Sequence, residues 1–268
     1  MNKFIYILLA ILTLSSCSQY QKALKSDDVE FKTKVFTQQI EKKKYSKAIR
    51  LFEQYATSYR GKPQGEIAFF NYAKALYVTK QYISAAYQFE SFASSYPKST
   101  NAEEASFLAA ESYSKVSPNF SLDQVDTDKA LNKLQVFANK YPNSQYLPKA
   151  NEIVKELTEK LELKAFEIAK QYNTVGEFTK DYNAAIKALD NFVFNYPGSK
   201  YKEDALYYKY DSMYKLAINS IPAKKEERLN TTKIYYQNLV KFKADTKYLE
   251  KSNKMLESVD KELKQYTN

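Results

Sequence analysis

A segment of about fifteen residues recurs along the chain, and this repetition limits the possible folds more than any other feature. Each copy has a small residue, usually Ala, at its fourth position, an aromatic residue or Leu four positions later, and an aromatic residue at its end. Apolar positions three and four residues apart lie on one face of an α-helix. Four clear copies and a degenerate fifth are found, at residues 45–59, 82–96, 127–141, 182–196 and 228–242. The pattern predicts a stack of helices.

Glycine and proline are scarce, with 4 and 7 residues in a chain of 268. The tight turns of an all-β fold depend on these two residues, so the composition favours an all-α fold. Three of the prolines, Pro97, Pro142 and Pro197, directly follow the last aromatic residue of a copy, where proline stops a helix.

A second helical pattern precedes the copies, most clearly at residues 66–77, 103–113 and 203–213. The predicted unit is therefore helix, turn, helix, turn. Small residues in both helices allow their backbones to approach closely. We predict five alanines as such close-contact positions, namely Ala73, Ala85, Ala110, Ala130 and Ala185.

These spacings resemble those of the tetratricopeptide repeat, and Ala73, Ala85, Phe89 and Pro97 match its pattern in the second copy. The resemblance implies about five helical hairpins that stack into a right-handed solenoid with a concave groove lined by the first helices. Two features depart from it. The last aromatic residues are 37 to 55 residues apart, which requires longer helices or loops near residues 115–127 and 173–181, and Phe36 stands where a small residue is expected.

The predicted repeat domain covers residues 29–244, and in the C-terminal segment 245–268 a last helix is expected over residues 245–266. Apolar residues of this helix recur at spacings of 3, 4 or 7, including Leu249, Leu256, Val259 and Leu263. The helix either caps the open end of the stack or docks a partner.

The N-terminus has the form of a bacterial lipoprotein signal. Lys3 precedes eleven residues, 4–14, that are almost all apolar, a stretch too short to span a membrane. The following Leu14-Ser15-Ser16-Cys17 resembles a lipobox, in which the cysteine receives a diacylglyceryl group. We expect removal of residues 1–16, a lipid on Cys17 and a tether over residues 17–28. The alternative is an ordinary signal peptide with an incidental cysteine.

The residue types exclude most enzyme chemistry. The chain has no His and one Cys, so it offers no Ser-His or Cys-His pair, no imidazole base and no His or Cys metal site. We predict no catalytic residue, no metal and no cofactor. The acidic pairs Glu103-Glu104 and Glu203-Asp204 stand at expected helix starts, where carboxylates favour the helix dipole. The net charge of +10 favours acidic partners in general. Nucleic acid is excluded as a partner, because an exported lipoprotein does not meet it.

The lipobox, the short tether and the irregular repeats together resemble the BamD family of outer-membrane assembly lipoproteins. The resemblance implies a non-enzymatic scaffold, anchored in the outer membrane and facing the periplasm, that binds unfolded barrel proteins and the periplasmic domains of the insertase BamA. Ser18 after the cysteine, in place of Asp, agrees with the outer membrane in the familiar sorting rule. Alternatives are a repeat adaptor of cell division or peptidoglycan, a glycan-binding helical lipoprotein, or a lipoprotein enzyme.

A candidate substrate groove follows from the first helices. Phe70, Lys74 and Tyr77 in one helix and Phe107 and Glu111 in the next are expected to lie off the packing face. Aromatic residues beside a cation suit an extended peptide that ends in an aromatic residue and a carboxylate. The alternative is that Phe70 and Tyr77 pack on neighbouring helices and Lys74 is only solvated.

Overall fold

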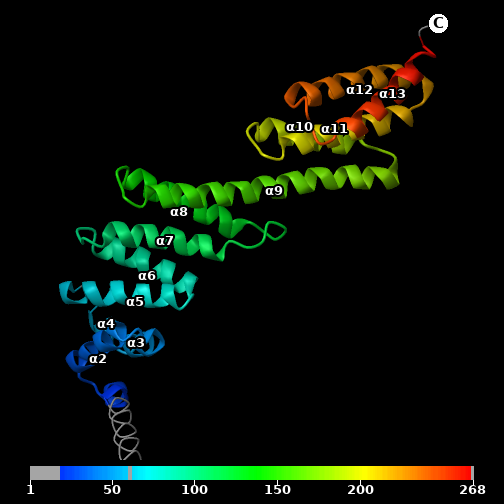
Figure 1. The fold of residues 1–268 in the computed structure, drawn as a ribbon. Coiled ribbons are helices and arrows are strands. Elements are labelled where there is room, and N and C mark those ends of the chain that lie inside the picture. Colours follow the sequence, from blue (N-terminus) through cyan, green and yellow to red (C-terminus); the bar gives the residue numbers. More distant parts are fainter. Residues whose placement is uncertain (1–18, 60–61, 267–268) are drawn as a thin grey trace, which may run out of the picture. The chain divides into compact units, whose positions relative to one another are not determined.

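The computed structural model describes residues 19–59 and 62–266, and every regular element in these residues is a helix (Figure 1). The long helices follow one another as five hairpins, α2 (Val29–Glu41) with α3 (Tyr45–Phe52), α5 (Glu66–Val78) with α6 (Tyr82–Ser95), α7 (Ala102–Val116) with α8 (Val125–Lys140), α9 (Leu147–Thr179) with α10 (Asn183–Asn195), and α11 (Lys202–Ile218) with α12 (Pro222–Phe242). The short α4 (Ala56–Tyr59) and a 3-10 turn, η1 (Pro63–Gly65), follow α3, and α13 (Leu249–Leu263) comes last. The predicted all-α, tetratricopeptide-like fold with five hairpins and a C-terminal helix is confirmed.

The chain divides into two compact units, a division that the sequence did not predict. Unit 1 comprises the residues up to Pro118 together with Asp123–Leu157. Unit 2 comprises Asn119–Leu122 and the residues from Thr158 onward. Residues of α9 belong to both units, since the division falls after Leu157.

The second helices of three hairpins end in the same backbone geometry. Tyr96, Tyr141 and Tyr196 have φ between −125° and −128° and ψ between 60° and 66°. Each precedes a proline, whose ring disfavours the α conformation of the residue before it. The recurring Tyr-Pro therefore sets where these helices stop.

The turn inside three hairpins uses a lysine in the left-handed conformation. Lys43, Lys80 and Lys180 have φ of 54°, 61° and 60°, and each follows the first helix of its hairpin. This conformation at a helix end usually belongs to glycine. The chain thus turns without glycine at these positions, at a cost in backbone strain.

A hydroxyl–carboxylate hydrogen bond ties the end of a hairpin to its start. The hydroxyl groups of Ser99, Ser144 and Thr246 donate to the glutamates near the starts of α5, α7 and α11, over 2.5, 2.6 and 2.7 Å. The acceptors are Glu66, Glu103 and Glu203. The helix-start carboxylates therefore have hydrogen-bond partners within the fold.

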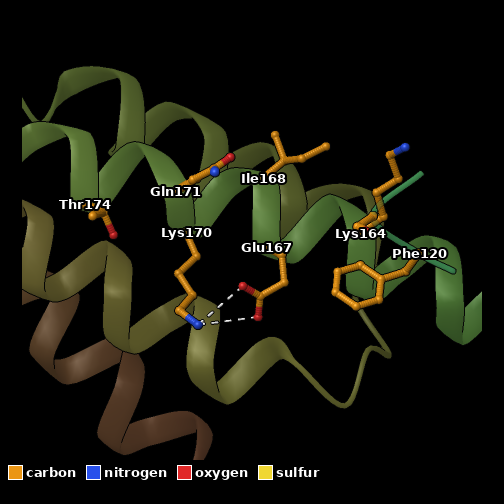
Figure 2. Close-up of a pocket in the computed structure, with 8 residues that line it drawn as sticks. Phe120, Lys164, Glu167, Ile168, Lys170, Gln171 and Thr174 are labelled. Carbon is orange, nitrogen blue, oxygen red and sulfur yellow. Dashed lines mark hydrogen bonds and ion pairs between the residues drawn. The ribbon is translucent and has the colours of Figure 1, made fainter. Parts of the chain in front are cut away.

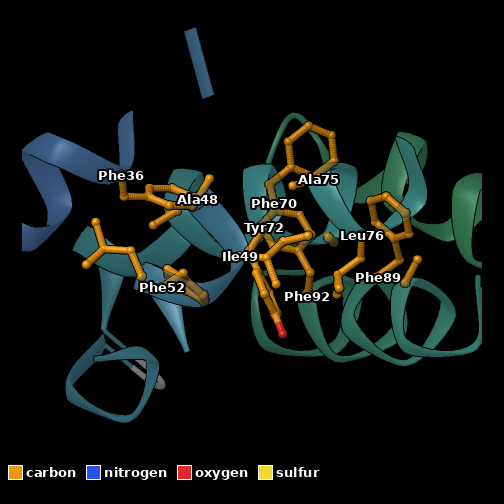
Figure 3. Packing of buried hydrophobic residues seen from close by; sticks show 14 of the residues in the cluster. Phe36, Ala48, Ile49, Phe52, Phe70, Tyr72, Ala75, Leu76, Phe89 and Phe92 are labelled. Carbon is orange, nitrogen blue, oxygen red and sulfur yellow. The ribbon is translucent and has the colours of Figure 1, made fainter. Parts of the chain in front are cut away.

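The predicted close-contact alanines lie in the cores. Ala73, Ala85, Ala110, Ala130 and Ala185 are all at most 1 % exposed. In unit 1, large aromatic side chains fill the space around such positions, and Figure 3 shows Phe36, Phe52, Phe89 and Phe92 in this packing. Phe36, where a small residue was expected, packs against Phe52 with ring centroids 5.2 Å apart.

Of the two alternatives near residues 173–181, a longer helix or a loop, the structure has a longer helix, whereas the predicted last helix differs from the structure. Residues 173–179 form the last turns of α9 and contain Gly176. A Cβ atom at Gly176 would lie 2.5 Å from the ring of Tyr182, so glycine permits the ring to cover the helix there. The last helix is shorter than residues 245–266, and its buried residues are Ser252, Met255 and Val259.

Candidate functional site

The predicted lipidation residue, Cys17, and the signal segment lie outside the described residues. The following chain is not an extended tether, because residues 19–25 are helical. Tyr20 and Ala23 are buried in the core of unit 1, at 6 % and 0 % exposure. Within the described residues, the core of unit 1 thus already includes Tyr20, three positions after Cys17 in the sequence.

The expectation that Phe70 and Phe107 lie off the packing face is wrong. Phe70 is 6 % exposed, and its ring lies 5.3 Å from that of Phe92 (Figure 3). Phe107 is 4 % exposed and stacks on Tyr146 at 4.9 Å. Both phenylalanines belong to the core of unit 1.

The two polar groove residues of α5 each pair with a carboxylate of α7, Lys74 with Glu104 and Tyr77 with Glu111. The Lys74 ammonium group lies 2.9 Å from Glu104 and 5.1 Å from the centre of the Phe70 ring. Tyr77 is partly buried, and both burial and the neighbouring carboxylate of Glu111 raise the pKa of its hydroxyl group. We call Lys74, Tyr77, Glu104 and Glu111 the α5–α7 cluster.

The members of this cluster differ in access. The side chain of Lys74 is 46 % exposed, as a groove residue should be. The expectation that Glu111 lies off the packing face is wrong, because Glu111 is buried, 4.0 Å from Lys115. The Lys74–Glu104 ion pair is exposed enough for water and salt to weaken it, so a ligand carboxylate could replace Glu104 at modest cost.

A cavity of about 300 Å³ lies elsewhere in unit 1 and was not predicted. Its walls come from α6, α7 and α8, with alanines and Phe137 beside two lysines. One of these, Lys133, pairs with Glu90. The alanines that line this cavity did not predict it, because alanines at such positions are also expected where helices pack closely.

A second cavity, of about 460 Å³, lies in unit 2 (Figure 2). Phe120 and Ser121 of the α7–α8 connection and residues 164–174 of α9 line it. In Figure 2, Lys170 reaches Glu167, with 3.4 Å between the two charged groups.

Beside this cavity, α9 carries exposed apolar residues at helical spacing. They are Ile168, Tyr172, Val175 and Phe178, which are between 45 % and 83 % exposed. Successive members are three or four residues apart, so they form one stripe along the helix. We call these four residues the α9 stripe.

The described residues contain no cluster of acidic residues or other ligands that could hold a metal ion. Among these residues, no helix has the length and apolar character needed to cross a membrane.

Residues 30–229 match the YfiO family, described as "Outer membrane lipoprotein". The putative outer membrane protein assembly factor BamD of Aquifex aeolicus (strain VF5) is 29 % identical over 154 residues, which cover 58 % of this chain and 49 % of that protein. The similarity thus spans about half the length of this relative. Because the family match covers most of the chain, including all hairpins up to α11 and part of α12, the protein belongs to the YfiO family of outer membrane lipoproteins.

Proposed function

We propose that this protein is a lipid-anchored scaffold that faces the periplasm and assists the assembly of β-barrel proteins into the outer membrane. The observation that carries the proposal is the family match over residues 30–229. The name of the Aquifex aeolicus relative, a putative outer membrane protein assembly factor, agrees with it. The scaffold acts by binding, without catalysis, cofactor or metal.

Unit 1 binds unfolded barrel substrates in this proposal, through the α5–α7 cluster. An extended peptide ending in a carboxylate could pair with Lys74 in place of Glu104, while the partly buried ring of Tyr77 contacts an apolar side chain. Phe70 does not contact the substrate in this proposal. Its ring positions the Lys74 ammonium group through a cation–π interaction. The substrate site is thus smaller and more polar than the sequence suggested.

Unit 2 docks the periplasmic domains of the insertase BamA in this proposal. The α9 stripe and the adjoining cavity supply apolar surface that is exposed in this chain. Exposed apolar patches of this kind commonly mark protein–protein contacts. Substrate binding and insertase docking are then carried out by separate units.

Capture of partners from the native membrane tests the docking part. Tagged wild-type protein should recover the insertase, and a Tyr172→Ser, Phe178→Ser double variant should lose it while keeping its fold by circular dichroism. A matched variant, Ile234→Ser, changes an exposed apolar residue of α12 away from the α9 stripe. Recovery of a cell-division or peptidoglycan-linked partner in place of the insertase would favour the adaptor alternative.

A further inference from the structure

Among residues 19–50, seven of the eight exposed basic residues lie in the helix at residues 19–25, in the α2–α3 turn and in α3. They are Lys22, Lys25, Lys42, Lys43, Lys44, Lys47 and Arg50, which we call the N-terminal basic patch. Residues 19–50 hold nine Lys and Arg against four Asp and Glu, so much of the chain's net charge of +10 arises in this short stretch.

The patch is not neutralised within the fold. No member has an ion pair among the residues that the structure describes, whereas lysines farther along the chain, such as Lys74, Lys215 and Lys243, lie within 3 Å of carboxylates. Of the nearby acids, Asp28 is engaged as the N-cap of α2, where it accepts from the backbone N–H groups of Glu30 and Phe31.

The fold brings part of the patch close to Tyr20, near the first of the described residues. The ammonium group of Lys47, in α3, lies 5.2 Å from the centre of the Tyr20 ring. Lys42, Lys43 and Lys44 form the turn that leads into α3, and Lys43 has a positive φ there. Tyr20 is three residues from Cys17, a distance that an extended chain covers in about 10 Å.

We propose that the N-terminal basic patch binds anionic phospholipid headgroups, so that the first hairpin lies against the bilayer that holds the anchor. The proposal rests on the proposed lipidation of Cys17 for its biological setting. A basic cluster beside a lipid anchor is attracted to a negatively charged leaflet, and the two signals together give firmer binding than a single one. The occupant is a lipid surface rather than an acidic protein, because the patch lies within the reach of the anchor.

Vesicle sedimentation tests the patch without the anchor. Mature protein carrying Cys17→Ser is mixed with vesicles of phosphatidylcholine alone or with added phosphatidylglycerol. We expect binding only to the vesicles with phosphatidylglycerol, and weaker binding as salt screens the charges. The triple variant Lys43→Glu, Lys44→Glu, Lys47→Glu should bind at least about tenfold more weakly.

A second triple variant provides the control with the same change in net charge. Lys155→Glu, Lys187→Glu and Lys241→Glu replace exposed lysines outside the patch. Equal loss in both triple variants would overturn the proposal, because net charge alone would then explain the binding. Absence of binding to anionic vesicles, with binding to soluble polyglutamate retained, would also overturn it in favour of an acidic protein partner.

These outcomes are independent of the proposed assembly function. The vesicles contain neither insertase nor substrate, and the protein used has no lipid. Loss of barrel assembly in cells with intact vesicle binding would count against the assembly function alone, whereas failure on vesicles would count against the patch alone.

Discussion

Ala184 and Ala185 are neighbours in α10, yet they differ completely in their surroundings. Ala185 is fully buried, whereas Ala184 is exposed. Leucine at position 185 should overpack the core and lower the free energy of unfolding by about 1–3 kcal/mol. Leucine at 184 should change it by less than about 0.5 kcal/mol. Urea unfolding of both variants checks this, and equal stabilities would show that the repeat register is wrong.

Lys80 turns the chain between α5 and α6 with φ of 61°. A side chain in this conformation is strained, and glycine would relieve the strain. Lys80→Gly should therefore raise the free energy of unfolding by about 0.5–1 kcal/mol, despite the added freedom of the unfolded chain. Lys34→Gly, at an exposed position inside α2, is the control and should lower it by about 1 kcal/mol. Destabilisation by both changes would contradict the strain at Lys80.

Lys74 is the accessible cation of the α5–α7 cluster. Lys74→Gln should weaken the binding of a barrel C-terminal peptide by up to about fivefold, since an exposed ion pair contributes up to about 1 kcal/mol. Lys133→Gln, in the cavity lined by α6, α7 and α8, should leave the affinity unchanged. Fluorescence titration of both folded variants measures the effect. Equal affinity of Lys74→Gln and wild type would place substrate binding elsewhere.

At the scale of elements, Glu203 near the start of α11 accepts hydrogen bonds from residues that follow α12 and so stabilises this hairpin. Burial opposes its ionisation, but hydrogen bonds from Lys243, Thr246 and the backbone N–H of Lys247 outweigh this and lower its pKa to about 2. A carboxyl group with a lowered pKa stabilises the fold above its unfolded pKa, near 4.5, and this contribution is lost as the pH falls toward 2.

Glu203→Gln should therefore be less stable than wild type at pH 6, and the difference should shrink between pH 4.5 and pH 2. Thermal unfolding across this range measures it. Glu250→Gln, at a highly exposed carboxylate of α13, is the control and should follow the wild-type curve. A constant difference between Glu203→Gln and wild type at all pH values would show that the ionised form is not the stabilising one.

The sequence predicted the helices and the hairpin order because the apolar period and the Tyr-Pro stops are local signals. It misplaced Phe70 because α5 packs against α3 on one side and α6 on the other. A helix that contacts two others buries two faces. A residue that lies off the first packing face can therefore be buried on the second, as Phe70 is. Near Gly176 the sequence left a longer helix or a loop open, because the role of this glycine depends on its close approach to Tyr182, a contact that periodicity does not reveal.

At the scale of the molecule, each unit has its own cores and its own candidate surface. The cores around Phe52 and Phe137 belong to unit 1, and those around Phe192 and Leu239 belong to unit 2. In a repeat protein each hairpin is stabilised mainly by its neighbours, so surfaces on different hairpins can change independently. This allows substrate binding and insertase docking to be separated by mutation.

Depletion of the protein in its native host, followed by quantitative proteomics of the outer membrane, tests the central claim most directly. We predict a selective loss of β-barrel proteins, restored by wild-type protein and not by a Cys17→Ala variant released from the membrane. Outer-membrane lipoproteins without a barrel should remain at their normal levels. Unchanged barrel proteins after depletion would contradict the assembly function.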